Sequence, residues 1–396
     1  MPFTTLGLSD TLTKPLARLG YTTPTPVQTQ SIPIVLDGSD LLARAQTGTG
    51  KTAAFGLPMI DRLLVRNRRR PGTRGPRGLV LVPTRELAIQ VHRSLADYGA
   101  AAGLKAAAIY GGVAMRPQRE ALRRGVDIVV ATPGRLIDHM QQRTIDLSGV
   151  EILTLDEADR MLDMGFQPAL RRILPALPRE RQTLLFSATL SKEVTRLAAE
   201  FTRSPLHVDV SARDVVAPTV THRVHSVPDG AKSNTLRDLL TRSADGQALV
   251  FCKTKRRSDR VGEHLNRAGI RTAVIHGNKS QGARDRALGD FKAGRVNVLV
   301  ATDLAARGLD ILHLPLVINY DLPLVAEDYV HRVGRTGRAG RSGHAVSLVT
   351  SADRHLLPAI QRLLPARMQE EHAGPPTLLA RITREAPARP AEARVR

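Results

Sequence analysis

Short apolar runs alternate with longer stretches of helical pattern along most of the chain. Five such runs lie in the first half and five in the second, at residues 79–82, 106–110, 127–130, 152–155, 183–186, 247–251, 271–275, 296–300, 316–320 and 345–349. A nearly continuous apolar run followed by a polar turn containing Gly or Pro is typical of a strand buried on both faces of a parallel sheet. The pattern therefore predicts a doubly wound α/β fold repeated in two consecutive domains.

Breaks in this pattern predict the domain boundaries. We expect a first domain at residues 1–203, a linker at 204–218, where Pro residues interrupt a stretch with little helical pattern, and a second domain at 219–372. Residues 373–396 are rich in Ala, Pro and Arg without apolar periodicity, which predicts a basic disordered tail. Residues 66–78 form a further basic loop broken by Pro and Gly. For both basic segments, simple solvation and contact with a polyanion remain open interpretations.

The charge of the chain favours a polyanionic partner. Its 396 residues carry a formal net charge of +21, and Arg supplies more of the positive charge than Lys. Planar guanidinium groups suit phosphate oxygens, although the charge could also serve only to keep the chain soluble. Aromatic residues make up 3% of the chain and Trp is absent, so we expect contacts to a nucleic-acid backbone rather than to stacked bases.

The sequence argues against a disulfide-stabilised protein, a zinc-binding protein and a membrane protein. Cys252 is the sole cysteine, which excludes a disulfide within the chain. His222 and His225 are three residues apart in a strand-like run, so they would point to opposite faces, and we interpret them as ordinary core or surface histidines. The first residues contain no basic segment followed by an apolar one, and no apolar run is long enough to span a bilayer. We therefore expect a soluble, cytoplasmic protein without a membrane partner.

A glycine-containing segment, AQTGTGKT, follows the apolar pair Leu41–Leu42 and precedes a helical pattern. Glycines in such a loop let backbone N–H groups surround a phosphate, Lys51 supplies a charge for the β- and γ-phosphates, and the Thr52 hydroxyl can bind Mg²⁺. Ala45 stands where the generic pattern has Gly, and a chance loop containing Gly-Lys-Thr is the alternative. The segment predicts an ATP site formed by Ala45, Gln46, Thr47, Gly48, Thr49, Gly50, Lys51 and Thr52.

Acidic residues directly follow the predicted strand at 152–155. Asp156 would hold Mg²⁺, and Glu157 would act as the general base on the attacking water. On their own, acidic residues at this place could instead stabilise a helix N-terminus. The phosphate loop upstream makes the catalytic interpretation the stronger one.

The second domain supplies the positive charge that phosphoryl transfer needs. The segment HRVGRTGR at residues 331–338 places Arg335 and Arg338 three residues apart, so both side chains can face one anion. Arginine fingers typically contribute ~10³ to 10⁵ in rate. A basic surface patch is the alternative. If both arginines are catalytic, residues of two domains would form the ATP site. Closure of the domains would then depend on the γ-phosphate.

The ordered series of these motifs is similar to that of the DEAD-box RNA helicases of superfamily 2, and nearest to the bacterial RhlE-like subgroup. The resemblance runs from Phe3 to about Val349. It implies two RecA-like domains joined by a flexible linker, and an RNA-dependent ATPase that binds single-stranded RNA, opens short duplexes locally and releases RNA after hydrolysis. ATP and Mg²⁺ would be the cofactors. RNA would be the partner, bound through its backbone without sequence preference, and protein partners in ribosome assembly or RNA decay stay open.

The resemblance also assigns roles around the nucleotide. The segment Gly20–Gln28 resembles the Q motif, in which Gln28 would read the adenine edge and Tyr21 would stack on its face, where Phe is the commoner residue. Phe3 would be the isolated upstream aromatic, and Asp310 would hold the ribose. The residues that would couple hydrolysis to strand opening are Asp159, Ser187, Thr189 and His331.

Two sets of residues at strand ends would face RNA. In the first domain they are Pro83, Thr84, Arg85, Gly112, Thr132 and Arg135. In the second domain they are Thr254, Lys255, Gly277, Arg284, Thr302 and Arg307. For any one of them, a turn or helix cap is the alternative interpretation. A preference for RNA over DNA requires contacts to 2′-hydroxyl groups, and it is implied by the resemblance alone.

Two other functions fit the same motifs. An ATP-gated clamp would hold RNA with little unwinding and would share every motif. A DNA helicase or translocase would share Lys51 and Arg335 but should not need Gln28 or Asp159.

Overall fold

The structure is a computed structural model of the chain. It describes residues 2–46, 48–65, 75–210, 220–228, 230–242, 246–306, 311, 314–337, 342–364 and 366–372. Several predictions lie outside this range, namely those for Thr47, Arg307, Asp310, Arg338, residues 66–74 of the basic loop, residues 211–218 of the linker and the tail at 373–396.

The chain divides into two compact units, Met1–Ala212 and Arg213–Arg396. Within its described residues, the first unit contains a seven-stranded sheet in the order β3-β4-β2-β5-β6-β1-β7, and all neighbouring strands are parallel. The strands are β1 (Leu41–Arg44), β2 (Gly78–Leu81), β3 (Ala106–Ile109), β4 (Ile128–Ala131), β5 (Ile152–Leu155), β6 (Gln182–Ser187) and β7 (Leu206–Asp209). Every position of β2, β4 and β5 is buried, as expected for strands covered on both faces.

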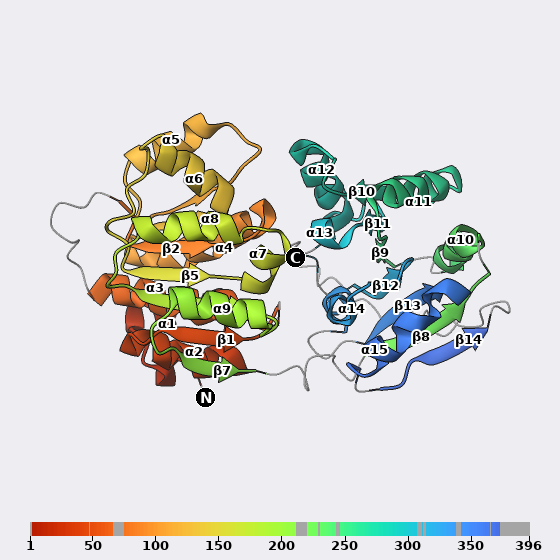
Figure 1. Cartoon of the computed structure of the whole chain (residues 1–396), viewed down its shortest axis with the longest axis horizontal. Coiled ribbons are helices and arrows are strands. Elements are labelled where there is room, and N and C mark those ends of the chain that lie inside the picture. Colours follow the sequence, from red (N-terminus) through yellow and green to blue (C-terminus); the bar gives the residue numbers. More distant parts are fainter. Residues whose placement is uncertain are drawn as a thin grey trace, which may run out of the picture. The chain divides into compact units, whose positions relative to one another are not determined.

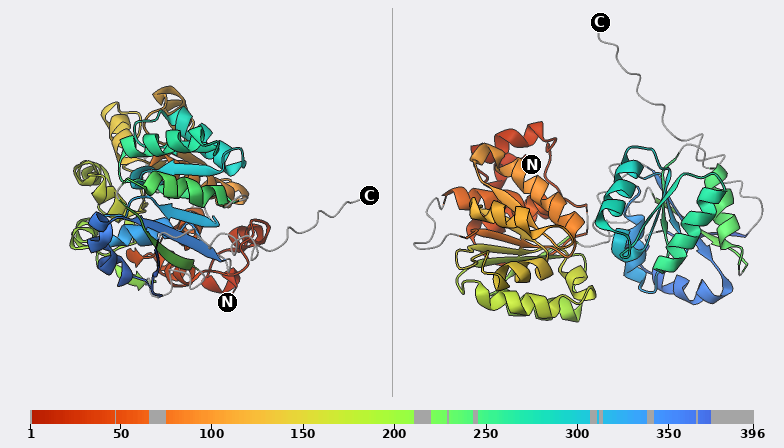
Figure 2. Two further views of the ribbon diagram at one scale, coloured as in Figure 1. Left: turned by 90° about the vertical axis from the view of Figure 1, so that its right-hand side faces the viewer. Right: turned by 90° about the horizontal axis from the view of Figure 1, so that it is seen from above.

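Helices cover both faces of this first sheet (Figures 1 and 2). The N-terminal helices pack on one face with Val80 and Phe186, whereas later helices pack on the other face with Leu79 and Leu81. The first layer is α1 (Asp10–Arg18), α2 (Pro26–Asp37), α3 (Lys51–Val65) and α4 (Arg85–Gly99), and the second is α5 (Met115–Arg123), α6 (Pro133–Gln141), α7 (Ala158–Asp163), α8 (Gln167–Ile173) and α9 (Lys192–Phe201). Short 3₁₀ helices are η1 (Phe3–Leu6), η2 (Ala100–Ala102) and η3 (Leu174–Ala176).

The second unit contains its own seven-stranded sheet among the described residues, in the order β10-β11-β9-β12-β13-β8-β14. All of its neighbouring strands are parallel. The strands are β8 (Val220–Ser226), β9 (Ala248–Phe251), β10 (Thr272–Ile275), β11 (Val298–Ala301), β12 (Leu316–Asn319), β13 (Gly343–Val349) and β14 (Gln369–His372).

Helices α10 (Lys232–Arg242) and α11 (Lys255–Arg267) pack with Val250 and Val300 on one face of the second sheet. The other face is covered by α12 (Gln281–Lys292), α13 (Asp303–Ala306), α14 (Ala326–Val333) and α15 (Leu357–Gln361), with η5 (Ser351–Leu356) before the last helix. In both units, Thr or Ser side chains cap helices that follow strands: Thr84 accepts from the Leu87 N–H, and Thr254 accepts from the Arg257 N–H. None of the described helices of either unit has the length and apolar character needed to cross a membrane.

The two sheets have the same strand order when their strands are numbered within each unit, which confirms the prediction of two tandem α/β domains. Each of the ten predicted strands overlaps an observed strand. The sequence pattern did not predict β1, β7 or β14, and β8 was recognised only as a strand-like run around His222 and His225. Three of the four residues of β7 are exposed, and β14 (QEEH) is entirely polar, because edge strands are covered less completely than central ones.

The predicted start of the linker at Ser204 is wrong. Residues Leu206–Asp209 form β7, which pairs with β1, and Leu206 N–H donates to the Asp40 carbonyl at 2.8 Å. The first unit therefore extends through this strand. The breaks at Pro residues indicated an irregular segment, but a short edge strand leaves too weak an apolar pattern to be recognised.

The two histidines of β8 belong to the core of the second unit. His222 and His225 are both buried, and they lie at positions of opposite orientation in the strand. Nδ1 of His222 lies 3.1 Å from the Tyr329 hydroxyl. Burial lowers the pKa of His222 to about 4, so its imidazole is neutral at physiological pH. The interpretation as ordinary histidines is consistent with this packing.

A buried ion pair fixes the amino-terminal ends of β2 and β5. Arg77 Nε donates to Glu151 Oε1 at 2.6 Å, and Arg77 Nη1 donates to the Leu63 carbonyl at the end of α3 at 2.7 Å. The Glu151 N–H donates to the Arg77 carbonyl at 2.7 Å. Both side chains are buried, so removal of one charge would leave the other without compensation.

We expect Glu151→Gln to lower the free energy of unfolding of the first unit by about 3 kcal/mol, because a buried guanidinium loses its counter-charge. The matched control is Asp209→Asn, which weakens the half-exposed Arg44–Asp209 pair and should cost less than about 1 kcal/mol. Urea denaturation of the intact chain measures both values. An equal decrease in the free energy of unfolding in Glu151→Gln and Asp209→Asn would contradict the importance of burial for the Arg77–Glu151 pair.

Candidate functional site

The glycine-containing segment forms a loop between β1 and α3. The Ala45 N–H donates to the Ser187 carbonyl at 2.9 Å, which places the loop at the carboxyl ends of β1 and β6. Thr49 Oγ1 donates to the Gln46 carbonyl at 2.7 Å. Gly48 and Gly50 have φ angles of 83° and 90°, a left-handed conformation that favours glycine. The loop thus has the strand-loop-helix context of a phosphate-binding segment.

Gln28 of α2 forms a hydrogen bond to this loop. Its Nε2 donates to the Gly50 carbonyl at 3.1 Å, and its Oε1 accepts from the Thr25 N–H at 2.8 Å. A Cβ atom added to Gly50 would lie 2.3 Å from Gln28 Nε2, so a side chain does not fit there. The predicted Q-motif glutamine therefore touches the phosphate loop directly, a contact that sequence reasoning did not anticipate.

Lys51 and Asp156 place opposite charges at the carboxyl ends of β1 and β5. The Lys51 side chain is buried, its Nζ lies 3.6 Å from Asp156 Oδ1, and it has no hydrogen-bond partner among the described residues. Burial raises the pKa of Asp156 to about 6, and the Lys51 charge opposes that shift. A buried ammonium that lacks hydrogen bonds favours an anionic ligand, because desolvated charge must be compensated.

The donor set fits Mg²⁺ only if a ligand supplies further oxygens. Asp156 and Thr52, which follows Lys51 in the first turn of α3, offer one carboxylate and one hydroxyl. Among the described residues, no group of three or more His, Cys, Asp or Glu side chains could hold a metal ion by itself. Mg²⁺ characteristically binds through one or two protein groups together with phosphate oxygens.

Glu157 is held in a strained conformation next to Asp156. It is a buried, non-glycine residue with a φ of 55°, and its N–H donates to Asp156 Oδ1 at 2.9 Å. Arg160 Nη1 donates to Glu157 Oε2 at 3.1 Å from the first turn of α7. Arg160 is itself buried. The sequence analysis missed it, although its position three residues after Glu157 on a helix was a usable signal.

Asp159 connects the acidic segment to the end of β6. Its Oδ2 accepts hydrogen bonds from the backbone N–H groups of Ala188 and Thr189, both at 3.0 Å, and from Thr189 Oγ1 at 3.2 Å. Ser187 is fully buried. The structure thus brings three of the predicted coupling residues, Asp159, Ser187 and Thr189, together within the first unit.

Tyr21 belongs to a cluster of three aromatic rings. Its ring meets Phe3 edge to face at a centroid distance of 6.1 Å and Tyr98 at 5.8 Å. The Tyr21 and Tyr98 hydroxyl groups lie 2.5 Å apart. Burial, followed by the hydrogen bond to Tyr21, raises the pKa of Tyr98. Tyr98 on α4 therefore accommodates the hydroxyl that distinguishes Tyr21 from the commoner Phe.

The predicted RNA-facing residues of the first unit gather at the carboxyl ends of β2, β3 and β4. A Cβ atom at Gly112 would lie 1.7 Å from Arg85 Nη1, so the guanidinium packs on bare backbone. Arg135 Nη2 donates to the Val113 carbonyl at 3.1 Å, while its Nη1 is buried without a hydrogen bond among the described residues. Thr84 and Thr132 immediately precede α4 and α6, and Pro83 precedes Thr84. Both arginines thus border one loop, at residues 111–113.

The second unit places its predicted residues at the equivalent edge. Lys255 Nζ donates to Asn278 Oδ1 at 2.7 Å, and a Cβ atom at Gly277 would lie 3.6 Å from Lys255 Cε. The Thr302 N–H donates to the Ile275 carbonyl at 3.4 Å. Thr254 caps α11, and Arg284 lies in the first turn of α12. All of these groups follow β9, β10 or β11.

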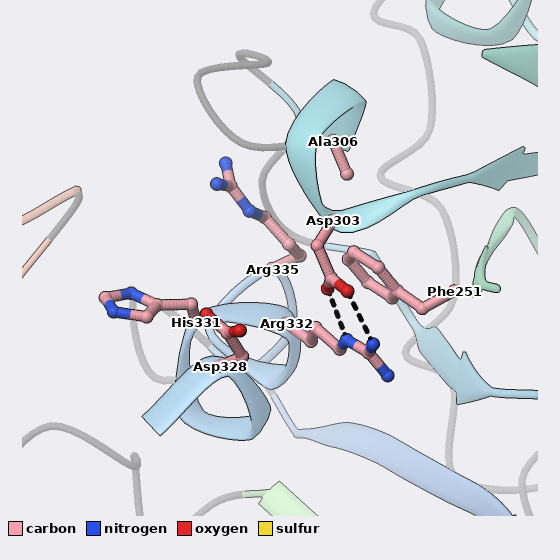
Figure 3. Close-up of a pocket in the computed structure, with 7 residues that line it drawn as sticks. All are labelled: Phe251, Asp303, Ala306, Asp328, His331, Arg332 and Arg335. Carbon is pink, nitrogen blue, oxygen red and sulfur yellow. Dashed lines mark hydrogen bonds and ion pairs between the residues drawn. The ribbon is translucent and has the colours of Figure 1, made fainter. Parts of the chain in front are cut away.

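Figure 3 shows Arg332 of α14 directed toward Asp303 and Phe251, whereas the side chains of His331 and Arg335 extend to the other side. Arg332 Nε and Nη2 donate to the Asp303 carboxylate at 2.6 and 2.7 Å, and Nη1 donates to the Asp321 carbonyl at 2.6 Å. Its guanidinium carbon lies 5.0 Å from the centre of the Phe251 ring. Arg332 therefore anchors α14, which carries His331 and ends at Val333, two residues before Arg335.

Sequence reasoning assigned no role to Arg332. The available signal was the helical spacing, since Tyr329 and Val333 on the same helix are apolar and Arg332 lies on their side. Such a charged residue on an apolar face requires a buried partner, and Asp303 at the end of β11 supplies it.

Two family descriptions match the chain. Residues 25–197 match the DEAD/DEAH box helicases, and residues 231–340 match the helicase conserved C-terminal domain. Together they cover the glycine-containing loop and the acidic segment of the first unit and residues 231–340 of the second unit.

Curated relatives are similar over almost the whole chain. The DEAD-box ATP-dependent RNA helicase 30 of Arabidopsis thaliana is 42% identical over 96% of this chain and 64% of its own length. The ATP-dependent RNA helicase RhlB of Xanthomonas campestris is 43% identical over 94% of this chain and 65% of its own length. The chain thus spans slightly less than two thirds of these relatives. Their names include RhlB, and the predicted RhlE-like subgroup is not confirmed.

Solved structures of this family have the same fold. S. cerevisiae Dbp5 bound to RNA and ADP BeF3 is 29% identical with a TM-score of 0.84, over 97% of this chain and 99% of that chain. A DEAD box protein from Methanococcus jannaschii is 36% identical with a TM-score of 0.53, over 94% of this chain and 99% of that chain. These matches identify the two units as tandem RecA-like domains. The chain belongs to the DEAD-box helicase family.

Proposed function

We propose that the protein is an ATP-dependent RNA helicase that binds single-stranded RNA, opens short duplexes locally and couples ATP hydrolysis to RNA release. The observation that carries the proposal is the buried Lys51 ammonium, which lacks a hydrogen-bond partner among the described residues and lies 3.6 Å from Asp156. Both residues lie beside a glycine-containing loop at the carboxyl ends of parallel strands. This is the arrangement that phosphoryl transfer requires.

The roles of the chain's own groups follow from their surroundings. Lys51 would bind the β- and γ-phosphates, and Glu157, oriented by Arg160, would polarise the attacking water. Arg335, together with Arg338, would stabilise charge that develops in the transition state. Gln28 and Tyr21 would recognise adenine, and Asp310 the ribose. The Gln28 contact to Gly50 would then connect base recognition to the phosphate loop.

Mg²⁺ is the metal that the donor set suits. Thr52 and Asp156 would hold it, and when bound it would neutralise charge on the phosphate oxygens. Asp156 must be ionised for this role, because a protonated carboxyl is a poor metal ligand. Its buried position therefore makes metal binding sensitive to pH.

RNA is the proposed polymer because both units expose basic and backbone donors at the same sheet edge. Arg85 and Arg135 border the 111–113 loop in the first unit, and Lys255 lies beside Gly277 in the second. The relatives named above are RNA helicases, and the Dbp5 structure contains RNA. Asp159 bridges the acidic segment and the end of β6, and it would transmit hydrolysis to the RNA side. The RhlE-like subgroup and a cytoplasmic location stay predictions.

An ATP-gated clamp and a DNA helicase remain the alternatives. A clamp would retain RNA in an ATP-dependent manner without displacing a strand. A DNA enzyme would show equal stimulation of its ATPase by matched RNA and DNA strands at fixed salt.

Lys51→Ala and Glu157→Gln should each abolish strand displacement on a short RNA duplex, with ATP turnover reduced by ~10² to 10⁴. Lys51→Ala should also weaken nucleotide binding, whereas Glu157→Gln should retain it, since the base acts only in the chemical step. Lys192→Ala and Glu193→Gln, at exposed positions of α9, are the matched controls. Unwinding by Lys51→Ala at the wild-type rate would remove ATP from the mechanism.

Lowering the pH below about 6 should weaken Mg²⁺-dependent nucleotide binding, because the raised pKa of Asp156 means that its carboxyl becomes protonated there. The measurement is the affinity for a fluorescent ADP analogue with Mg²⁺ and with EDTA, between pH 5 and pH 7.5. The nucleotide's own phosphate titrates nearby, so Asp156→Asn serves as the control that retains only the nucleotide's contribution. The same pH dependence in both proteins would contradict the role of Asp156.

A further inference from the structure

A groove lies at the amino-terminal ends of the strands of the first sheet, opposite the ends that carry the nucleotide site. The groove has a volume of about 1000 Å³ and is lined by Pro76 before β2, Val126 before β4 and Ile145 before β5. These positions precede the strands, whereas Lys51, Arg85 and Asp156 follow them. Because all strands of the sheet are parallel, the groove and the nucleotide site occupy opposite edges. The proposed helicase function does not use it.

Arginine side chains form the rim of the groove. Arg116, Arg119 and Arg123 follow one another at spacings of three and four residues along α5, so they share one helix face. Arg143, just after α6, lines the same groove. Arg116 pairs with Glu120 at 3.0 Å. The guanidinium groups of Arg119, Arg123 and Arg143 have no hydrogen bond or ion pair within the described part of the chain. Asp146 also lines the groove, so the four arginines and two carboxylates give the lining a net positive charge.

The floor of the groove is apolar. Leu122, Met140 and Ile145 line it as partly buried side chains packed on the core of the first unit, and Val126 is buried beside them. No aromatic residue is among the lining residues. Apolar surface that stays accessible beneath a charged rim favours a ligand that has both acidic and apolar groups.

A network of hydrogen bonds holds the two helices that carry the rim. His139 of α6 is fully buried, with Nδ1 2.7 Å from Thr144 Oγ1 and Nε2 3.3 Å from Gln118 Oε1 of α5. Gln118 Nε2 donates to the Tyr110 carbonyl at the end of β3 at 3.0 Å. Burial and the neighbouring Arg135 charge lower the pKa of His139, which keeps the ring neutral. Helices α5 and α6, adjacent in the first unit of Figure 1, therefore present a preformed surface.

We propose that this groove binds a segment of a partner protein in which carboxylate side chains flank an apolar residue. Arg guanidinium groups bind carboxylates in bidentate fashion, and an apolar side chain can occupy the floor. A nucleic acid fits less well, since phosphates gain nothing from an apolar floor and single-stranded bases need aromatic platforms, which the lining residues do not include.

The test uses a fluorescein-labelled peptide, Glu-Glu-Leu-Glu-Glu-Leu-Glu-Glu, and fluorescence anisotropy with the full chain. Arg119→Glu/Arg123→Glu should weaken binding about tenfold or more, because two attractive contacts become repulsive. The matched control is Arg172→Glu/Arg196→Glu, the same charge change at exposed positions of α8 and α9, and it should alter binding less than about twofold. A peptide with Ser in place of both Leu residues should bind at least about tenfold more weakly, because its side chains lose the apolar contact with the floor of the groove.

Circular dichroism and RNA-stimulated ATPase of Arg119→Glu/Arg123→Glu should match the wild type, since both arginines are exposed and lie on the edge opposite the nucleotide loop. Equal loss of peptide binding in the two double variants, or no binding by the wild type, would overturn the proposal. So would a selective loss of affinity for an oligouridylate in Arg119→Glu/Arg123→Glu, which would make the groove a nucleic-acid surface. Peptide binding by a chain without ATPase would refute the helicase function and leave the groove supported.

Discussion

The common direction of the strands determines where chemistry can lie in this protein. All neighbouring strands in each sheet are parallel among the described residues, so the turns that follow them meet at one edge. Buried strands leave their polar groups at these ends, where backbone donors and helix N-termini point outward. The phosphate loop follows β1 and Asp156 follows β5, and β6 lies between these two strands. The adjacency of lysine and carboxylate is therefore a consequence of strand order. The parallel direction of the strands also separates the arginine-rimmed groove from the nucleotide site, because the residues that line the groove precede the strands.

At these strand ends, neighbouring side chains hold several of the groups to which we assign chemistry. Arg160 orients Glu157, and Gln28 holds the loop at Gly50. Arg332 pairs with Asp303 and thereby anchors α14, which ends two residues before Arg335. Buried charges are costly unless they are paired, so these contacts serve positioning more than stability. Lys51 differs from these paired groups. Its Nζ lies 3.6 Å from Asp156 Oδ1 and forms no hydrogen bond among the described residues. This incomplete compensation is the reason we propose that the site binds an anion.

The sequence predicted the fold class and supplied the candidate site residues because both leave local patterns. Buried parallel strands are continuous apolar runs, and phosphate loops require Gly and Lys at fixed spacing. Edge strands such as β7 expose most of their side chains and leave no such run. Contacts between distant residues were not predictable either: nothing local pairs Arg332 with Asp303, or Tyr21 with Tyr98, because those partners meet only through the tertiary fold. Spacing supplied the residues to which we assign chemistry, and the structure supplied the contacts that orient them.

The proposed division of nucleotide chemistry between the two units is tested most directly by single-turnover ATP hydrolysis in the presence of RNA. We predict that Arg335→Ala slows the hydrolysis step by ~10³ while nucleotide affinity changes less than about threefold, because the guanidinium acts on charge that develops in the transition state. Arg295→Ala, which removes an exposed guanidinium of the second unit, should hydrolyse ATP at the wild-type rate. Hydrolysis of ATP by Arg335→Ala at the wild-type rate would contradict a catalytic role for the second unit. So would a large loss of nucleotide affinity with an unchanged rate of turnover.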